Sequence, residues 1–266
     1  MIDTLTHLPP WIFSLFGLVI GLMVGSFANV CISRLPKKQS VVFPASHCPK
    51  CNQPIHVTDN IPIISYILLK GQCRNCQQKI SPIYPAIELI TGLLMAAVFY
   101  RFGFSVECLI FAIVVPALVI ITAIDIEHQI IPDVITLPGI PFGLVAGSYM
   151  VGVWDSLIGL ALGGGMFLLL AEGYYRMRGS VGMGGGDIKY IAAAGALMGW
   201  VQVLFIIFIG ALAGGLFGGL GMGFKKLNFL SKIPFGPFLA LATLISIFFG
   251  EPIVDWYLGT FMPKPL

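Results

Sequence analysis

Long apolar runs constrain the fold of this chain more than any other feature. Hydrophobic residues make up 57% of the sequence and charged residues only 10%, whereas soluble proteins carry about a quarter charged residues. A run of about 20 apolar residues is long enough to cross the hydrocarbon core of a bilayer as a helix. The sequence therefore excludes a soluble globule and predicts an all-α, polytopic membrane protein embedded in a lipid bilayer.

Eight apolar runs are predicted to span the membrane, so the expected fold is a bundle of about eight transmembrane helices. They cover residues 11–31, 86–101, 107–124, 134–152, 156–174, 188–201, 203–223 and 236–254. The sixth run is short and rich in Gly and Ala. A seven-span bundle with one long bent helix over 188–223 is therefore the alternative. Glycine is concentrated in the fifth to seventh runs, where small residues let membrane helices approach closely.

The distribution of Lys and Arg predicts the orientation of the bundle. With eight spans, thirteen of the fifteen Lys and Arg residues fall on one side: Arg34, Lys37, Lys38, Lys50, Lys70, Arg74, Lys79, Arg176, Arg178, Lys189, Lys225, Lys226 and Lys232. Only Arg101 and Lys264 fall on the other side. Because Lys and Arg accumulate in cytoplasmic loops, the first side should face the cytoplasm and both termini should face out. The net charge of +3 reflects this topology and does not imply nucleic-acid binding.

The first apolar run is expected to stay in the protein as a transmembrane helix. It has no basic segment before it and no small-x-small cleavage site after it, so it does not match a cleaved signal peptide. The polar stretch that follows, 32–85, is the only connection large enough to have a fold of its own. Its apolar content is small, and a segment of about fifty residues then needs a staple such as a structural metal.

Four cysteines in this polar stretch form two C-x2-C pairs, Cys48-Pro-Lys-Cys51 and Cys73-Arg-Asn-Cys76. Each pair can present two sulfurs to one metal, and the second pair completes a tetrahedral zinc site. The gap between the pairs is one residue longer than the usual template. Two disulfides are the alternative, but a cytoplasmic location disfavours them. Zinc with four thiolates has no open position, so its predicted role is structural.

The remaining cysteines and the nearby histidines are interpreted as unrelated to the metal. Cys31 and Cys108 fall within or beside apolar runs, where a free cysteine behaves as a small packing residue. His47 and His56 lie close to the cysteine pairs in the sequence. We expect both to be bystanders.

Two aspartates, Asp125 and Asp187, each lie at the edge of an apolar run on the predicted cytoplasmic side. A carboxylate beside apolar membrane helices is costly and calls for a reason. Two carboxyl groups brought close together share one proton over a wide pH range. The ionised group can then take a proton from water while the protonated group polarises a peptide carbonyl. The pair therefore predicts amide hydrolysis without a metal or a covalent intermediate.

The residues around these aspartates have simpler interpretations. Gly182 to Gly186 form a Gly-rich run against which an extended substrate could lie closely. Asp133 follows a proline and is interpreted as the N-cap of the fourth span. Glu127 and His128 are interpreted as a solvated loop pair. Glu172 is one turn before Arg176 and is expected to pair with it.

Motifs along nearly the whole chain resemble those of a known family. Gly184-Gly-Gly186-Asp187 fits the Gly-x-Gly-Asp signature of intramembrane aspartyl proteases, and the chain is more closely similar to the bacterial type IV prepilin peptidases. The motifs are Gly25-Ser-Phe-Ala-Asn29, Arg34-Leu-Pro36, Ser46-His-Cys-Pro49, Asp59-Asn-Ile-Pro-Ile-Ile-Ser-Tyr66, Gly71-Gln-Cys73, Tyr84-Pro-Ala-Ile-Glu88, the segment Asp125 to Asp133, and Gly182-Met-Gly-Gly-Gly-Asp187-Ile-Lys189.

The resemblance implies a bifunctional enzyme of the bacterial inner membrane. It would remove the leader of type IV prepilins or type II secretion pseudopilins on the cytoplasmic side. It would then methylate the new N-terminal amine with S-adenosylmethionine. Asp125 and Asp187 would be the catalytic pair, and Cys48, Cys51, Cys73 and Cys76 the zinc ligands. The expected parts are a first helix at 1–31, a zinc-binding domain at 32–85 and an intramembrane aspartyl peptidase domain at 86–266.

The methyltransferase half has no sequence signature of its own. No Gly-x-Gly loop of the kind that follows a strand in soluble cofactor-binding domains occurs, and the cofactor-binding residues are unknown. Asn29, Gly71 and Glu88 are candidates by location alone, with helix packing or loop support as the simpler interpretation. Two other functions are weighed against the peptidase. A transporter would usually bury its carboxylates mid-span, and a zinc-loop scaffold would need no carboxylate pair.

Overall fold

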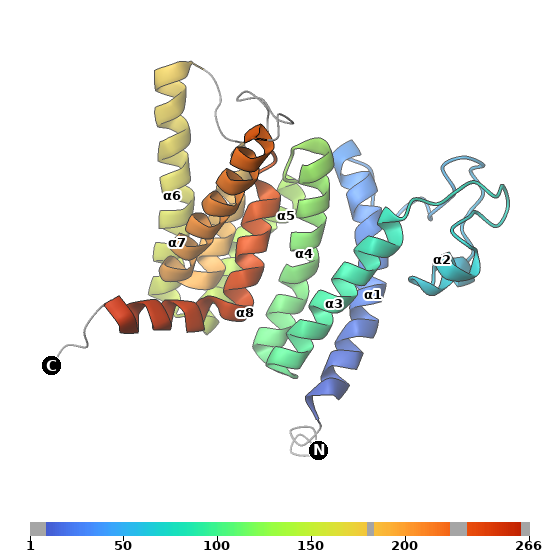
Figure 1. The fold of residues 1–266 in the computed structure, drawn as a ribbon, viewed down its shortest axis with the longest axis horizontal. Helices are drawn as coiled ribbons and strands as arrows, with labels where there is room; N and C mark the ends of the chain where they lie inside the picture. Colours follow the sequence, from blue (N-terminus) through green and yellow to red (C-terminus); the bar gives the residue numbers. More distant parts are fainter. Residues whose placement is uncertain (1–8, 180–183, 224–232, 262–266) are drawn as a thin grey trace. The chain divides into compact units, whose positions relative to one another are not determined.

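The structure is a computed structural model that describes residues 9–179, 184–223 and 233–261 (Figure 1). Across these residues the chain is helical, and the only β pairing is two isolated bridges. The all-α prediction is therefore confirmed for the part that the structure describes. Some residues used in the sequence analysis lie outside the described residues, namely Gly182, Lys225, Lys226, Lys232 and Lys264.

Seven long helices make up most of the described chain. They are α1 (Pro10–Arg34), α3 (Ile83–Phe102), α4 (Val106–His128), α5 (Asp133–Met150), α6 (Val153–Arg178), α7 (Gly185–Gly223) and α8 (Gly236–Phe261). Six of these helices are long and apolar enough to cross a membrane. Helix α5, which begins with Asp133 and contains two prolines, is not among the six. Helix α7, which covers two of the predicted spans, is one of the six and is counted as a single helix. The chain is thus a multi-pass membrane protein, while the number of eight crossings stays a prediction.

Helix α7 is interrupted at Gly199, whose φ of 80° and ψ of 175° are not helical. The chain turns back at this point. A Cβ added to Gly195 would lie 3.2 Å from the Val203 side chain, although eight residues along an unbroken helix rise about 12 Å. Glycine adopts a positive φ without the steric cost that other residues meet. The geometry favours the two predicted spans, 188–201 and 203–223, over one continuous bent helix.

The chain divides into two compact units, residues 1–123 and 124–266, with the boundary inside α4. In the first unit α1 and α3 pack antiparallel, because Gly17 lies against Phe99 and Gly25 against Glu88. A Cβ added to Gly21 would lie 2.6 Å from the Met95 Cβ. This spacing leaves no room for a larger side chain, so glycines four residues apart on α1 permit the close helix contact.

The second unit is arranged around α7, which packs against α5, α6 and α8. Close contact again depends on small residues. A Cβ on Gly163 would meet the main-chain oxygen of Ile191 at 2.7 Å. The buried Ser156 hydroxyl donates a 2.6 Å hydrogen bond to the Ala196 carbonyl. The expected packing role of glycine in the fifth to seventh runs is therefore confirmed at these contacts.

Candidate active site and metal centre

The four cysteines at 48, 51, 73 and 76 come together in one cluster within the first unit. Their sulfur atoms all lie within 4.8 Å of one another, and the Cys48 and Cys76 Sγ atoms are 3.8 Å apart. A tetrahedron of sulfurs about 2.3 Å from a central zinc has edges of about 3.8 Å. The donor set and spacing therefore fit a four-thiolate metal site, and the structure brings together all four residues that the sequence singled out.

Two matching turns build this cluster. In the first, the Cys48 N–H donates to the Gln53 carbonyl, and the Asn52 N–H returns a bond to the Cys48 carbonyl, both at 2.9 Å. In the second turn, the Cys73 N–H donates to the Gln78 carbonyl, and the Gln77 N–H donates to the Cys73 carbonyl, again both at 2.9 Å. Asn52 and Gln77 both have a positive φ. The two turns form a short internal repeat, residues 47–54 and 72–79.

Hydrogen bonds favour ionised sulfur at Cys48, whereas hydrogen bonds from the other three cysteines contribute to raising the pKa of the Cys76 thiol to about 11. Hydrogen bonds from the main chain of Cys51 and Lys50 lower the pKa of the Cys48 thiol to about 6, and thiolate is the form that binds metal. Arg74 donates a 2.8 Å hydrogen bond from Nε to the Asp59 carboxylate. This contact holds the pKa of Asp59 below its ordinary value. It also ties the short 3₁₀ helix Val57–Asn60 to the second cysteine turn.

Two of the three candidate methyl-donor residues have structural partners. The buried Glu88 on α3 accepts a 2.8 Å hydrogen bond from the Ile63 N–H, and Ile63 has a φ of 61°. The Asn29 side chain on α1 donates to the Tyr84 carbonyl at 3.1 Å. The first contact joins the polar stretch to α3, and the second joins α1 to the residues where the polar stretch ends and α3 begins. They are consistent with the simpler interpretation of loop support and helix packing.

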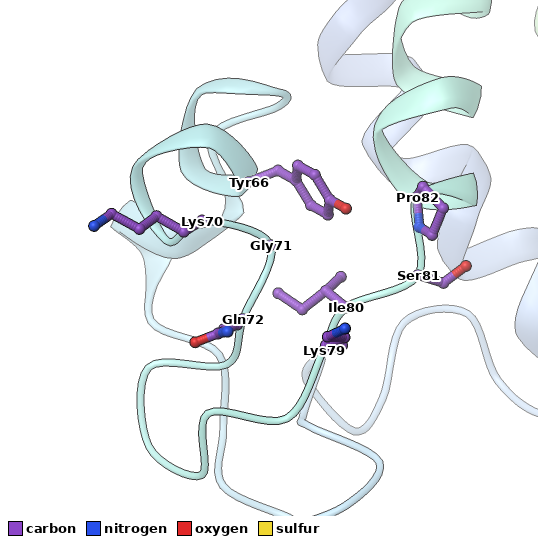
Figure 2. A pocket seen from close by; sticks show the side chains of 8 residues that line it. All are labelled: Tyr66, Lys70, Gly71, Gln72, Lys79, Ile80, Ser81 and Pro82. Atoms are coloured by element: carbon purple, nitrogen blue, oxygen red, sulfur yellow. The ribbon is translucent and has the colours of Figure 1, made fainter.

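The third candidate, Gly71, lines an open pocket of about 390 Å³ (Figure 2). The pocket also involves Tyr66, Lys70, Gln72, Lys79, Ile80, Ser81 and Pro82. Figure 2 shows the Tyr66 ring and Ile80 pointing toward each other, while the Lys70 amine points away. Gly71 has a φ of 68°, and a Cβ there would lie 3.0 Å from the Tyr66 hydroxyl. Only glycine therefore fits this wall of the pocket without strain.

Asp125 lies in the last turn of α4 and is 5% exposed. Its Oδ2 accepts a 2.8 Å hydrogen bond from the main-chain N–H of Gly236, the first residue of α8. Gly236 is not among the site residues predicted from the sequence. The sequence signal that marks this helix start is the pair Gly236-Pro237 before an apolar run, since proline is common at the first position of a helix.

Asp187 lies in the first turn of α7 and is half-buried. Its N–H donates to the Gly184 carbonyl at 3.1 Å, and a Cβ on Gly184 would lie 3.1 Å from Asp187 Oδ2. The carboxyl groups of Asp187 and Asp125 are close enough for their charges to interact. The structure therefore brings the two predicted aspartates together in the second unit.

An ion pair joins the segments that carry these aspartates. Lys189 Nζ lies 2.7 Å from Asp133 Oδ1, and Gly186 packs so closely on Ile131 that a Cβ would lie 2.8 Å from the Ile131 Cβ. The N-cap of α5 is Pro132, and it makes no side-chain capping bond. The interpretation of Asp133 as an N-cap is wrong, because its carboxylate pairs with Lys189 across the site. The expected pair of Glu172 with Arg176 is confirmed at 2.8 Å.

Both units match known families. The Bacterial Peptidase A24 N-terminal domain matches residues 19–102, which contain the four clustered cysteines. The Type IV leader peptidase family matches residues 112–219, which contain Asp125 and Asp187. Relatives are similar to this chain over nearly its full length. The chain belongs to the type IV leader peptidase family. The resemblance drawn from its motifs is therefore confirmed.

Several family members are named prepilin leader peptidase/N-methyltransferase. The protein from Aeromonas salmonicida is 35% identical, over 97% of this chain and 98% of its own length. The protein from Legionella pneumophila is 32% identical, over 98% of this chain and all of its own. The protein from Pseudomonas aeruginosa is 34% identical, over 94% of each chain. No solved structure matches this chain.

Proposed function

We propose that this protein is an intramembrane aspartic endopeptidase with a second, N-methyltransferase activity. It cleaves the leader peptide from type IV prepilins and type II secretion pseudopilins. It then methylates the new N-terminal residue with S-adenosylmethionine as donor. Membership of the type IV leader peptidase family and the double name of relatives along the whole chain support both activities.

The observation that carries the peptidase assignment is the meeting of two acids at the ends of separate apolar helices. Asp125 ends α4 and Asp187 begins α7, and their carboxyl groups interact electrostatically. Among the described residues, no serine or cysteine side chain that could act as a nucleophile is hydrogen-bonded to either carboxyl group. A pair of carboxyl groups can divide the roles of acid and base between them.

The reaction follows from this division of roles. The ionised carboxylate takes a proton from a water molecule, whose oxygen attacks the carbon of the scissile peptide. The protonated carboxyl group donates its proton to the carbonyl oxygen. The resulting tetrahedral diol then collapses: one diol hydroxyl returns a proton to the ionised carboxylate, the protonated carboxyl group donates its proton to the nitrogen, and the C–N bond breaks. Asp125 and Asp187 end with one shared proton, as they began, and no covalent bond to the enzyme forms.

The cysteine cluster is proposed to hold one zinc ion with a structural role. Cys48, Cys51, Cys73 and Cys76 would supply four thiolates, which fill a tetrahedral coordination sphere and leave no position for water. The ion would join the two matching turns and so fold a stretch that has little apolar core. The methyl donor is proposed to bind in the same polar stretch, where Gly71 lines the open pocket.

The polar stretch and both carboxyl groups are proposed to face the cytoplasm of a bacterial cell, with the helices in its inner membrane. The bias of Lys and Arg toward that side supports this orientation. A reducing cytoplasm also suits free thiols. Among the cysteines that the structure describes, all six are free.

One experiment tests both activities of the proposal. Purified protein in detergent or nanodiscs is incubated with a full-length prepilin and isotopically labelled S-adenosylmethionine, and the product is analysed by mass spectrometry. We expect a shortened pilin that carries one labelled methyl group on its new N-terminal amine. An intact prepilin after prolonged incubation with folded protein would contradict the assignment. A shortened but unlabelled pilin would contradict the methyltransferase half alone.

The ion pair between Lys189 and Asp133 is expected to contribute to cleavage by orienting the segments that carry the two acids. Replacing Lys189 by methionine should slow cleavage by less than about tenfold, since a partly exposed pair contributes about 1 kcal/mol or less. Cleavage rates and thermal unfolding would be measured together. The matched control is Arg176→Met, which breaks the exposed ion pair with Glu172 in the same unit.

Comparison with this control decides whether the pair acts on the site. Arg176→Met should cleave like the unmodified protein. If Lys189→Met cleaved at the same rate as this control, the ion pair would have no positioning role. If the pair does act as a unit, the double variant of Lys189→Met with Asp133→Asn should lose little more than either single variant.

A further inference from the structure

We propose that Gly236 is a positioning residue for cleavage: its main-chain N–H holds the Asp125 carboxylate, and its lack of a side chain leaves the space that this carboxylate occupies. The inference rests on the proposed function and deepens it. It extends the site beyond the two acids to the start of α8. The contact joins residues 111 positions apart in the chain.

The N–H of Gly236 is available because it lies at the start of a helix. The first N–H groups of a helix have no partner within it. Here Gly236 donates to Asp125 at 2.8 Å, and Pro237 has no N–H. The next donors, Phe238 and Leu239, both bond to the Phe235 carbonyl at 3.1 Å. Of these three N–H groups in the first turn of α8, the one of Gly236 bonds to a residue outside the turn. Its hydrogen bond with Asp125 is buried.

This bond restricts how the Asp125 side chain can turn. One carboxylate oxygen, Oδ2, is bonded to Gly236, so rotation about the Cβ–Cγ bond would break the contact. The start of a helix also carries partial positive charge that attracts a carboxylate. Helix α8 therefore holds the Asp125 carboxylate in one orientation. Such preorganisation matters because catalytic geometry tolerates only small displacements.

Only glycine fits beside this carboxylate. A Cβ built on Gly236 would lie 2.7 Å from Asp125 Oδ2, 3.1 Å from its Cγ and 3.3 Å from its Cβ. The closest of these distances is shorter than real Cβ contacts allow, so the carboxyl group would have to move. Because Asp125 is short and attached to α4, any movement changes its position relative to Asp187.

The same helix also holds the segment of the second acid. Tyr190 lies three residues after Asp187 on α7, and its hydroxyl forms a buried 2.7 Å hydrogen bond with Thr243 Oγ1 on α8. The Thr243 hydroxyl in turn donates to the Leu239 carbonyl at 2.9 Å. Helix α8 thus contacts Asp125 through its first residue and the Asp187 segment two turns later. This second contact supports α8 as the element that sets the relative position of both acids.

Gly236→Ala in the full-length protein tests the inference. We expect kcat for prepilin cleavage to fall about 10²-fold, the cost of a displacement of about 1 Å at a catalytic group. KM should change by less than about twofold, because Gly236 acts on the chemical step and not on substrate binding. Methylation of a pilin that has already lost its leader should be unchanged, since it does not use the carboxylate pair.

Two glycines of the same helix provide matched controls. A Cβ at Gly259 would have no neighbour within 4 Å, so Gly259→Ala should cleave normally. Gly250 is packed tightly against Gln202 and Ser246, away from the two acids. Gly250→Ala should therefore destabilise the helix packing without a specific loss of kcat. Thermal unfolding of all variants separates instability from misplacement.

The results distinguish this inference from the proposed function itself. Cleavage by Gly236→Ala at a rate close to that of Gly259→Ala would overturn the positioning role. A loss no greater than that of Gly250→Ala at equal stability would overturn it as well, because packing alone would then explain the effect. Normal cleavage by Asp125→Asn would instead overturn the proposed function. A low kcat in Gly236→Ala with KM, methylation and stability retained supports the inference.

Discussion

Asparagine in place of Asp125 or Asp187 should stop prepilin cleavage. Each acid has a proton-transfer role that asparagine cannot perform, and such a role contributes about 10²–10⁴-fold to the rate. The two variants should each lose about the whole of this factor, because residues that act as one unit do not contribute additively. Initial rates of leader removal from a purified prepilin would measure the effect.

Asparagine keeps the shape of aspartate, so the protein should remain folded and inserted. At position 125 its amide oxygen can still accept the hydrogen bond from Gly236. Asp255→Asn is the matched control, because Asp255 is an exposed carboxylate of α8. It should cleave at the unmodified rate. Either active-site variant that cleaves as fast as Asp255→Asn would show that the pair is not the catalytic device.

The sequence predicted the helices well where the apolar runs are long. The first three runs lie within α1, α3 and α4, and the fifth lies within α6. Hydrophobic length is a property of each segment alone, so it can be recognised without knowing what the segment contacts. The break at Gly199 was harder to place, because the adjacent runs have similar composition and the evidence for a turn comes from contacts across the bundle.

The candidate sites were predictable to the extent that their signals are local. The C-x2-C spacing identifies each pair of ligands, and the structure brings the two pairs together. The position of Asp125 and Asp187 at the ends of apolar runs identified both acids. Neither pattern gives a distance between the acids. Their proximity depends on how α4 and α7 pack, which is a tertiary property.

Contacts between distant segments could not be predicted from local patterns. Asp133 follows a proline before an apolar run, which is typical of a helix start. Its carboxylate instead forms an ion pair with Lys189, which lies 56 residues away in the sequence. Gly236 has no chemical side chain to attract attention. Its importance comes from a main-chain N–H and an empty volume next to Asp125. Both properties are visible only after the helices are packed.

Replacing Cys48 or Cys73 by serine should release the metal and unfold the polar stretch. Each cysteine would supply one of four thiolates, and structural zinc contributes about 10–16 kcal/mol of binding free energy to a small domain at neutral pH. Elemental analysis should find about one zinc per chain in the unmodified protein and a large deficit in either variant. Trypsin should then cut faster at Lys50, Arg74 and Lys79, which lie within the two cysteine turns.

Cys31→Ser is the control for loss of a thiol outside the cluster. Cys31 is buried in α1, so its replacement should leave the zinc content unchanged. A purified protein that contains no zinc would contradict the proposed metal. Zinc content in Cys48→Ser and Cys73→Ser equal to that of Cys31→Ser would show that the cluster is not its site.

A change of donor at Cys76 separates coordination from packing. Cys76 is the exposed member of the cluster, so a larger side chain meets less steric resistance there than at the buried Cys48. Zinc accepts three thiolates and one imidazole as readily as four thiolates in structural sites. Cys76→His should therefore retain zinc and resist trypsin, while Cys76→Ser should lose both properties. If Cys76→Ser kept as much zinc as Cys76→His, the sulfur at 76 would not be needed for metal binding, because a serine hydroxyl is a far weaker zinc ligand than an imidazole.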